Sequence, residues 1–405
     1  MKKHIASILF LFLLSTFQLI AQSHSVKRLG IEQGLSNNYV VSITQDKQGF
    51  LWFATEEGLN KFDGTRFTTY YKNDLTQENQ GITGNELNRV YADTKHPIIW
   101  IATQRDGLNA YNYNEQTFTA YQHNPENPHS LITNDVTDIS PSTQHDDGLW
   151  ISTYYRGIEY LDITSGQFTH YNKSTVPGLP CDQTWTVLDG GDGNLYIGHV
   201  GSGFSIFSPK DKSVKNFRNE AGNPMSLPGN DVFCIIKDAN GNIWLGTNNG
   251  LALYDAANEN FITFKNNKND KYATLCSRIL SIRQLKDNRL WIASELNGIA
   301  ILNLKQSMFL SPEEISLEYI QEGADSRSLS NASARCIFQD SFDNIWIGTW
   351  GGGINFISSK PPLFTTLSYS PIPNNENGLN NKVASSLCMD RQGRVWIGTD
   401  GGGIN

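Results

Sequence analysis

The sequence predicts an all-β protein, and more specifically a β-propeller with seven four-stranded blades. Three observations support this fold. A Trp-centred motif recurs through the 405 residues, each copy contains four short strand-like segments, and no segment shows helical periodicity. A repeat of about 40–50 residues that supplies four antiparallel strands is typical of a propeller blade. Eight blades around one axis are the alternative.

The recurring motif is centred on one aromatic residue per copy. Successive centres are separated by 48, 50, 46, 48, 47, 55 and 50 residues. Each centre is followed after six or seven residues by a glycine that precedes Leu, Ile or Phe. Such a regular interval indicates an internal repeat. The eight centres are Trp52, Trp100, Trp150, Tyr196, Trp244, Trp291, Trp346 and Trp396.

The four segments of a unit follow one another in a fixed order. The first is a β-branched run that ends near an Asp, as at residues 40–46. The second reads Leu/Ile-Trp-Ile-Gly/Ala-Thr, as at 345–349, and the third begins at Gly-Leu/Ile-Asn. The fourth is Phe-x-x-Tyr or a variant, as at 67–70. Turns such as Asp46-x-x-Gly49 separate the segments, because glycine readily adopts the positive φ of a tight hairpin.

The N-terminus carries two features outside the repeats. Residues 1–21 combine Lys2 and Lys3 with an apolar run that ends at Ala21, which predicts a cleaved export signal. The apolar run at 5–20 is shorter than the ~20 residues that span a bilayer. Residues 25–31 read as a lone strand, which would pair with the seventh unit or lie beside residues 364–367 and so close the ring.

These features predict three regions. They are a signal peptide at 1–21, a propeller at 22–375 and the start of a second propeller at 376–405. In the eight-bladed alternative, residues 376–405 belong to the same ring. The sequence ends inside the third strand of the eighth unit, which indicates a gene fragment or a truncated product.

Composition and motif content exclude several functions. Forty acidic against 32 basic residues give a net charge of −8 without a basic stripe, so nucleic acid is not a predicted partner. No catalytic triad, paired-carboxylate motif, phosphate loop or metal-ligand spacing is present, so no catalytic residue, cofactor or metal is assigned. The five cysteines show no disulfide spacing, and Cys234 and Cys336 lie in apolar runs, which predicts buried, unpaired thiols.

The repeat resembles a known family. The pattern Asp-x-x-Gly-x-Leu/Ile-Trp-Ile-Gly-Thr-x-x-Gly-Leu/Ile-Asn, followed by Tyr/Phe-Asp and Phe-x-x-Tyr, is similar to the two-component regulator propeller repeat. The resemblance covers residues 35–405. Tyr196 departs from it, residues 95–98 lack the turn glycine, and the sixth unit is stretched around 307–318.

The resemblance implies the periplasmic sensor region of a hybrid two-component histidine kinase. Such a protein typically has two propellers, an immunoglobulin-like domain, one membrane helix that anchors it in the inner membrane, and a kinase that starts a phosphorelay. The family typically senses glycan fragments, so the resemblance implies an oligosaccharide ligand and allows a homodimer. The immunoglobulin-like, membrane and kinase modules are missing from this sequence, so no kinase activity is assigned to it.

Candidate ligand-binding residues are those that break the repeat in loops on the channel face of a propeller. Aromatic side chains there stack on sugar rings, and Arg donates directional hydrogen bonds to hydroxyl or carboxylate groups. A secreted lectin or a polysaccharide-degrading enzyme on the same fold is the alternative function. The predicted ligand-binding residues are Arg105, Tyr154, Tyr155, Arg156, His199 and Trp350.

Overall fold

The computed structural model describes residues 25–72, 81–264, 273–304, 317–325, 327–360, 367, 369 and 378–405. The predicted export signal at 1–21 and residues 364–366 lie outside this part of the chain. Two compact units, 1–359 and 360–405, are described separately. No helix in the described residues is both long and apolar enough to cross a membrane.

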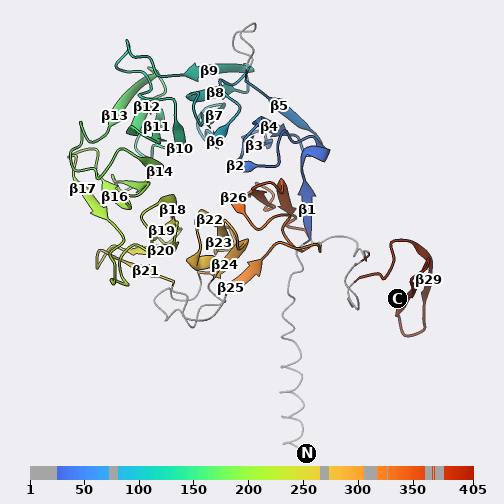
Figure 1. Cartoon of the computed structure of the whole chain (residues 1–405). Coiled ribbons are helices and arrows are strands. Elements are labelled where there is room, and N and C mark those ends of the chain that lie inside the picture. The colour runs from blue at the N-terminus through green and yellow to red at the C-terminus, as the bar shows by residue number, and fades with distance from the viewer. Residues whose placement is uncertain are drawn as a thin grey trace, which may run out of the picture. The chain divides into compact units, whose positions relative to one another are not determined.

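The first unit is a ring of four-stranded antiparallel sheets around a central channel (Figure 1). The first blade consists of β2 (Val40–Gln45), β3 (Leu51–Thr55), β4 (Gly58–Phe62) and β5 (Phe67–Tyr70). The second consists of β6 (Leu87–Ala92), β7 (Ile98–Thr103), β8 (Leu108–Asn112) and β9 (Thr117–Tyr121). The third consists of β10 (Val136–Pro141), β11 (Gly148–Thr153), β12 (Gly157–Asp162) and β13 (Gln167–Tyr171).

The next three blades repeat this order from the channel outward. The fourth consists of β14 (Thr184–Asp189), β15 (Leu195–His199), β16 (Phe204–Phe207) and β17 (Val214–Phe217). The fifth consists of β18 (Val232–Lys237), β19 (Ile243–Thr247), β20 (Gly250–Asp255) and β21 (Asn260–Thr263). The sixth consists of β22 (Ile279–Gln284), β23 (Arg289–Ser294), β24 (Ile299–Asn303) and β25 (Leu317–Ile320). Two short 3₁₀ turns, η1 (Ile31–Gln33) and η3 (Thr274–Cys276), connect strands.

The seventh blade joins the two ends of the ring. It contains β26 (Ala334–Gln339), β27 (Ile345–Thr349) and β28 (Ile354–Ile357), and its outer strand is β1 (Val26–Leu29) from the N-terminal side. β1 and β28 are antiparallel, with Val26 opposite Ile357 and Leu29 opposite Ile354. This pairing removes the open edge that an incomplete blade would expose. The prediction of seven four-stranded blades is confirmed, and the eight-bladed alternative is wrong.

A hydrogen bond between an aspartate and the central tryptophan explains much of the repeat. In the first blade, the Asp46 carboxylate accepts hydrogen bonds from the backbone N–H groups of Gln48 and Phe50 in the turn. The same carboxylate accepts the indole N–H of buried Trp52 at 2.8 Å. The turn and the buried indole are therefore satisfied by one side chain, as buried polar groups require. The pairs Asp93–Trp100, Asp238–Trp244 and Asp340–Trp346 repeat this bond.

Three blades lack this aspartate, and the hydrogen bonding of their central residues differs: two have no acceptor among the described residues, and one has a different acceptor. Ser142 and Leu285 occupy the aspartate position in the third and sixth blades, where the indole N–H groups of Trp150 and Trp291 have no acceptor within the part of the chain that the structure describes. The fourth blade has Gly190 at that position. There the Tyr196 hydroxyl, which replaces the indole, donates instead to Asp192 at 2.8 Å. The departure at Tyr196 therefore keeps the hydrogen bond with a different donor and acceptor.

The repeated glycine is required by a positive φ and by close backbone packing. Gly353 has φ of 71°, and its N–H donates to the Asn38 carbonyl at 2.9 Å. A Cβ at this position would overlap the carbonyl oxygen of Leu29 in β1. Only glycine fits such a backbone without strain. The corresponding Gly203 has φ of 83° and would meet the carbonyl oxygen of Phe217.

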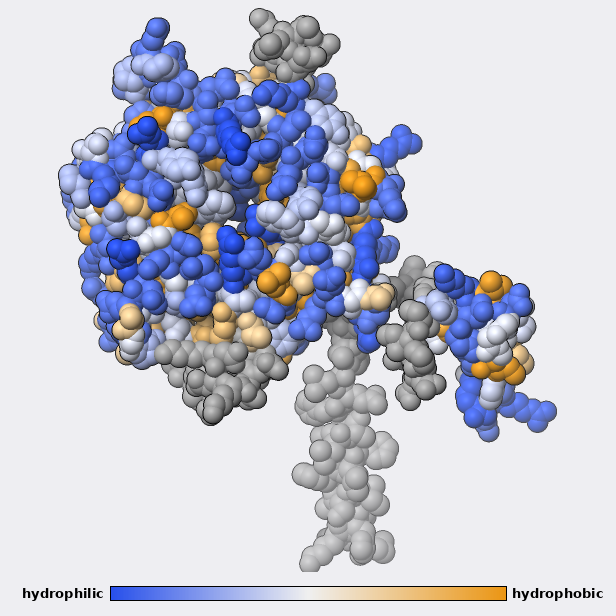
Figure 2. Space-filling model, viewed as in Figure 1, coloured by the Kyte–Doolittle hydropathy of each residue, from blue (hydrophilic) through white to orange (hydrophobic). Residues whose placement is uncertain are grey.

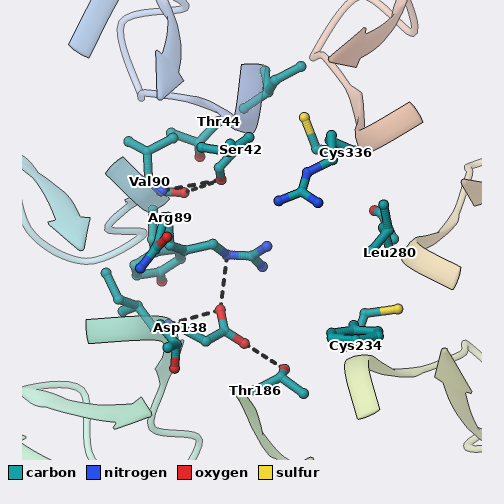
Figure 3. Close-up of a pocket in the computed structure, with 18 of the residues that line it drawn as sticks. Ser42, Thr44, Arg89, Val90, Asp138, Thr186, Cys234, Leu280 and Cys336 are labelled. Atoms are coloured by element: carbon teal, nitrogen blue, oxygen red, sulfur yellow. Dashed lines mark hydrogen bonds and ion pairs between the residues drawn. The ribbon is translucent and has the colours of Figure 1, made fainter. Parts of the chain in front are cut away.

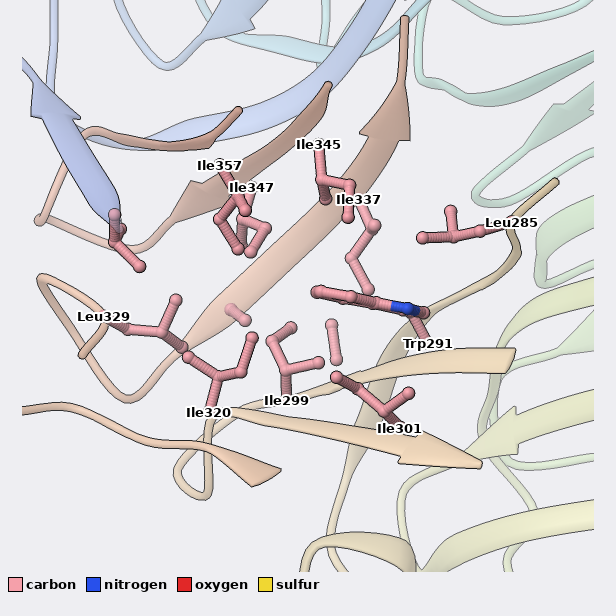
Figure 4. Packing of buried hydrophobic residues seen from close by; sticks show 13 residues of the cluster. Leu285, Trp291, Ile299, Ile301, Ile320, Leu329, Ile337, Ile345, Ile347 and Ile357 are labelled. Atoms are coloured by element: carbon pink, nitrogen blue, oxygen red, sulfur yellow. The ribbon is translucent and has the colours of Figure 1, made fainter. Parts of the chain in front are cut away.

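The hydrophobic core consists of clusters between neighbouring blades. Figure 4 shows one of these clusters, in which Trp291, Ile299 and Ile301 of the sixth blade pack against Ile337 and Ile347 of the seventh. Because each blade buries one face against the next, the ring is stabilised along its whole circumference. The face of the ring that is visible in Figure 2 is mostly hydrophilic, with scattered apolar side chains.

The second unit contains a further repeat. It has three strands, β29 (Ala384–Met389), β30 (Val395–Thr399) and β31 (Gly403–Ile404). The Asp390 carboxylate accepts the Trp396 indole N–H at 3.0 Å, as in the blades of the ring. Trp396 itself is 44% exposed. The predicted further repeat is present, and its hairpins carry the same Asp–Trp hydrogen bond as blades of the ring.

Candidate ligand-binding site at the mouth of the central channel

The seven innermost strands line a cavity of about 1070 Å³ that forms the central channel. Small-molecule sites usually measure ~300–1,000 Å³, so this volume is sufficient for a small ligand. Its walls carry hydroxyl, thiol, arginine and aspartate side chains, as Figure 3 shows for Ser42, Thr186, Cys234, Arg89 and Asp138. The channel is the natural place to look for a site, because every blade contributes to it.

A β-bulge near the start of each innermost strand shapes one end of this channel. In the seventh blade the register shifts between Ala334 and Cys336, so Arg335 is the extra residue. The same shift occurs in all seven innermost strands. Bulges redirect side chains, and here the bulged residue lines the channel at its loop end. The bulged residues are Val41, Asn88, Thr137, Trp185, Phe233, Leu280 and Arg335.

Aromatic side chains from the third, fourth and fifth blades form half of an arc around this end. Tyr154 contacts Tyr155 with ring centroids 4.4 Å apart, and it meets Trp185 at 6.1 Å. Trp185 in turn meets Phe233 at 5.8 Å. Trp185 is half-buried and Tyr155 is 53% exposed, so part of this aromatic surface is available to a ligand.

Two arginines on aromatic rings form the other half. The Arg278 guanidinium lies 4.3 Å from the Phe233 ring centroid, and its terminal nitrogen pairs with Glu295 at 3.2 Å. Arg335 lies 4.5 Å from the ring centroid of Trp350, which also packs edge-on against Tyr39. We call the set Tyr39, Tyr154, Tyr155, Trp185, Phe233, Arg278, Glu295, Arg335 and Trp350 the mouth arc.

The electrostatics of the mouth arc favour a ligand that accepts hydrogen bonds. The buried Nε–H of Arg278 has no acceptor among the described residues. Burial lowers the pKa of Arg335, and the positive charge of neighbouring Arg278 adds to this effect. Arg335 forms no ion pair in the described part of the chain, so its guanidinium donors are available for a further partner.

Three of the six predicted ligand-binding residues belong to the mouth arc. Tyr154 and Tyr155 follow β11, and Trp350 follows β27, so each lies in a turn between the second and third strands of its blade. The structure therefore brings them to the same end of the channel. Trp350 is 40% exposed and forms an antiparallel bridge with Tyr39 of the first blade.

The two predicted arginines lie on the same loop face but outside the channel lining. Arg105 and Arg156 are exposed in the turns that follow β7 and β11. Neither lines the cavity. Arg105 lies near Asp135, whose pKa burial raises and Arg105 lowers. These arginines are placed to contact only those parts of a ligand that extend over the loops.

His199 is not part of the candidate site, because it is buried and cannot contact a ligand. It is fully buried at the end of β15, where its Nε2 lies 2.8 Å from the Ser205 hydroxyl and its Nδ1 lies 3.5 Å from the Cys181 thiol. Burial lowers the pKa of His199 to about 4, so the ring is neutral at pH 7. It occupies the position of Thr153, whose hydroxyl donates to the Gly157 carbonyl in the third blade. His199 is therefore part of the scaffold.

Six members of the mouth arc were not among the predicted ligand-binding residues: Trp185, Phe233, Arg335, Arg278, Tyr39 and Glu295. The first two and Arg335 occupy the second position of an innermost strand, where other repeats have Val41, Asn88 or Thr137. That variation was a usable signal, because a scaffold position should keep one residue type across repeats. The bulge that turns this position toward the channel is visible only in the structure.

The remaining predictions on chemistry concern metals and thiols. Within the described residues, no group of three or more His, Cys, Asp or Glu could hold a metal ion. Cys234 and Cys336, which were predicted to be unpaired, form no disulfide within the described residues, and neither do Cys181 and Cys388. Cys234 and Cys336 line the channel, where burial raises the pKa of both thiols to about 12, so they are protonated at neutral pH. Cys388 is exposed.

Comparisons with known proteins agree with this fold. The family model described as "Two component regulator propeller" matches residues 34–57, 226–249, 328–351 and 378–401. Each stretch covers the first two strands of a repeat and the turn after them. A 66-residue segment is 42% identical to histidine kinase P4 of Formosa agariphila, which is 16% of this chain and 5% of that protein.

Solved structures extend the similarity over nearly the whole chain. The extracellular domain assigned to the hybrid two component system BT3049 from B. thetaiotaomicron is 64% identical, with a TM-score of 0.78. The match covers 94% of this chain and 48% of that domain, so the chain spans about half of it. The corresponding domain of BT4673 is 19% identical with a TM-score of 0.62, over 93% of this chain and 44% of that one, and shows the fold alone. The two-component regulator propeller model therefore matches four repeats of the chain, and the chain is similar in fold and sequence to the extracellular domain of BT3049.

Proposed function

We propose that this chain is the ligand-sensing part of an extracytoplasmic sensor and that it binds a glycan fragment at the mouth arc. The observation that carries the proposal is the continuity of the arc. Aromatic rings from the third to the fifth blade and arginine-aromatic pairs from the fifth to the seventh surround one end of the channel. Rings that stack on sugars and arginines that donate hydrogen bonds are what a glycan site requires.

The individual side chains support different parts of this recognition. Half-buried Trp185 and exposed Tyr155 offer flat surfaces for sugar rings. The unpartnered Nε–H of Arg278 and the guanidinium of Arg335 offer donors to hydroxyl oxygens. In this proposal, Arg105 and Arg156 contact the portions of a longer glycan that lie outside the channel.

We extend the proposal to the longer protein of which this chain would be a part. We infer that residues 1–21 direct export to the periplasm and that residues 376–405 begin a second propeller. The apolar residues exposed on the further repeat, such as Leu387 at 72% and Met389 at 70%, fit a face that another blade covers. A membrane segment and a histidine kinase would then transmit the signal, as the names of the relatives suggest.

Isothermal titration calorimetry with a panel of neutral and acidic oligosaccharides tests the proposed site. For a glycan that binds, Trp185→Ala and Trp350→Ala should each weaken binding about tenfold, because a well-formed aromatic contact contributes ~0.5–1.5 kcal/mol beyond its buried area. Phe342→Ala is the matched control, because Phe342 is 73% exposed in the turn between β26 and β27, away from the mouth arc. Equal affinity in all three variants would contradict the proposed site.

A further inference from the structure

The interior of the channel has an unbalanced positive charge. We define the interior by the lining residues from the third position onward in the seven innermost strands. Among the described lining residues, its charged groups are Arg89, Arg283 and Lys237 against one carboxylate, that of Asp138. The other carboxylates of the lining, Glu56, Glu57, Glu86 and Glu295, belong to loops at the mouth. The positive charge is therefore concentrated inside the channel of a protein with a net charge of −8.

Asp138 is fully occupied by neighbouring groups. Its Oδ1 lies 3.1 Å from Nε of Arg89 and also accepts the backbone N–H of Ile139. Its Oδ2 accepts the Thr186 hydroxyl at 2.6 Å. Figure 3 shows this arrangement, with the terminal nitrogens of Arg89 directed into the channel. Asp138 therefore balances the charge of Arg89.

Lys237 and Arg283 are held differently. The Lys237 ammonium donates to the Gly190 carbonyl at 2.6 Å. Arg283 forms no ion pair and no hydrogen bond within the described residues, and its guanidinium lies 5.8 Å from the Phe338 ring centroid. Arg283 is exposed and lines the same cavity as Arg89. Desolvation among the channel strands lowers the pKa of Arg283, and the positive charge of Arg89 lowers it further.

Two guanidinium groups in one channel with one carboxylate form an incomplete charge network. Arginines bind oxyanions strongly because their donors match the planar oxygens. A bound anion would balance Arg283 and bridge it to Arg89. The hydroxyl group of Ser281 lines the same level of the channel as Arg89 and could also donate to the anion.

We propose that the channel interior is an oxyanion-binding site in which Arg283 and the terminal nitrogens of Arg89 hold a carboxylate or sulfate group. Two sources of this group fit the channel, a free oxyanion and the acidic group of a sugar. The site does not require the mouth arc to bind a glycan. If both sites are occupied together, the ligand is an acidic sugar with its anionic group inside the channel.

Calorimetry with sulfate, glucuronate and glucose at constant ionic strength tests the site and shows whether its oxyanion is free or belongs to a sugar. The chain should bind sulfate and glucuronate but not glucose. Tighter binding of glucuronate would identify an acidic sugar, whereas equal binding would identify a free oxyanion; both results support the site. No binding of either anion would overturn it.

Variants of Arg283 distinguish anion binding at this site from a general effect of losing one positive charge. Arg283→Gln should weaken sulfate binding about ten- to hundredfold, the range expected for one charge-assisted contact, and Arg283→Lys should retain part of the affinity. Arg66→Gln is the control, because Arg66 is exposed in the turn before β5 and its side chain forms no ion pair in the described residues. Unchanged sulfate binding in Arg283→Gln would overturn the proposal.

Thermal unfolding keeps the test informative if a variant is unstable. Sulfate should raise the unfolding midpoint of the unmodified chain and of Arg66→Gln, but not that of Arg283→Gln. Without sulfate, Arg283→Gln should unfold at about the same temperature, because Arg283 is exposed and forms no ion pair in the described residues. If Trp185→Ala abolishes glycan binding but keeps sulfate binding, both proposals stand. If no glycan binds but sulfate binding depends on Arg283, only the proposed sensing function fails.

Discussion

The seventh blade and the further repeat have nearly the same local structure in different surroundings. Each has an Asp–Trp hydrogen bond, of 2.8 Å between Asp340 and Trp346 and of 3.0 Å between Asp390 and Trp396. Each has a bulge near the start of its first strand. Yet Trp346 is 5% exposed, whereas Trp396 is 44% exposed. The repeat therefore encodes its own hairpins, while the burial that stabilises a blade comes from its neighbours.

Replacing the central tryptophan should give the largest difference in stability between the seventh blade and the further repeat. Trp346→Ala should destabilise the propeller by ~3–5 kcal/mol, because it leaves a cavity between two blades. Trp396→Ala should cost less than ~1 kcal/mol, because the indole is already partly exposed. Urea unfolding followed by circular dichroism measures both. Similar losses would show that Trp396 is buried by contacts absent from the described residues.

The repeated glycine provides a second matched pair with a smaller effect. In Gly353→Ala, the positive φ costs ~1–2 kcal/mol, and overlap with the Leu29 carbonyl adds to this by disturbing β1. In Gly403→Ala, only the cost of the positive φ applies, because no atom lies near the added Cβ. Hydrogen exchange of the β1 amides should increase in Gly353→Ala alone. Unchanged exchange in that variant would show that β1 tolerates the displacement.

Restoring a missing aspartate should have a modest stabilising effect. The third blade has Ser142 where four other blades have the aspartate, and the buried Trp150 N–H has no acceptor in the described part of the chain. Ser142→Asp should stabilise the propeller by ~0.5–1.5 kcal/mol, the net value of one hydrogen bond. Chemical denaturation at pH 7 measures the gain. Ser142→Asn is the uncharged control, and an equal or larger gain in that variant would show that the carboxylate charge is unimportant.

The smallest effect concerns the pH dependence of the further repeat. The hydrogen bond from Trp396 and those from the turn lower the pKa of Asp390 to about 2. Because the folded-state pKa lies below the ordinary value of 3.8, the contribution of this carboxylate is complete above pH 4 and is lost as the pH falls through about 2. The NMR shift of the Trp396 indole N–H should follow that titration. A midpoint near 3.8 would contradict the hydrogen bond.

The fold could be predicted from the sequence because its main determinants are local and repeated. The spacing of Trp52, Trp100 and their counterparts indicated seven blades with eight as the alternative, and the lone strand at 25–31 indicated how the ring closes. The site was predicted only in part. Tyr154, Tyr155 and Trp350 lie in loops whose position follows from the fold, whereas Trp185, Phe233 and Arg335 depend on bulges inside strands. His199 resembled a loop residue in sequence but is a buried strand end.

The sequence by itself determined the repeat and its turns, because hydrogen bonds such as Asp46 to Trp52 connect residues within one unit. Only the tertiary structure decided that the ring closes at seven blades, through the pairing of β1 with β28, and which side chains meet in the channel. Arg89 and Arg283 are almost two hundred positions apart, and they line one cavity because the ring places their strands around one axis. Side chains from different blades share no local sequence signal, so their charges and contacts follow from ring closure alone.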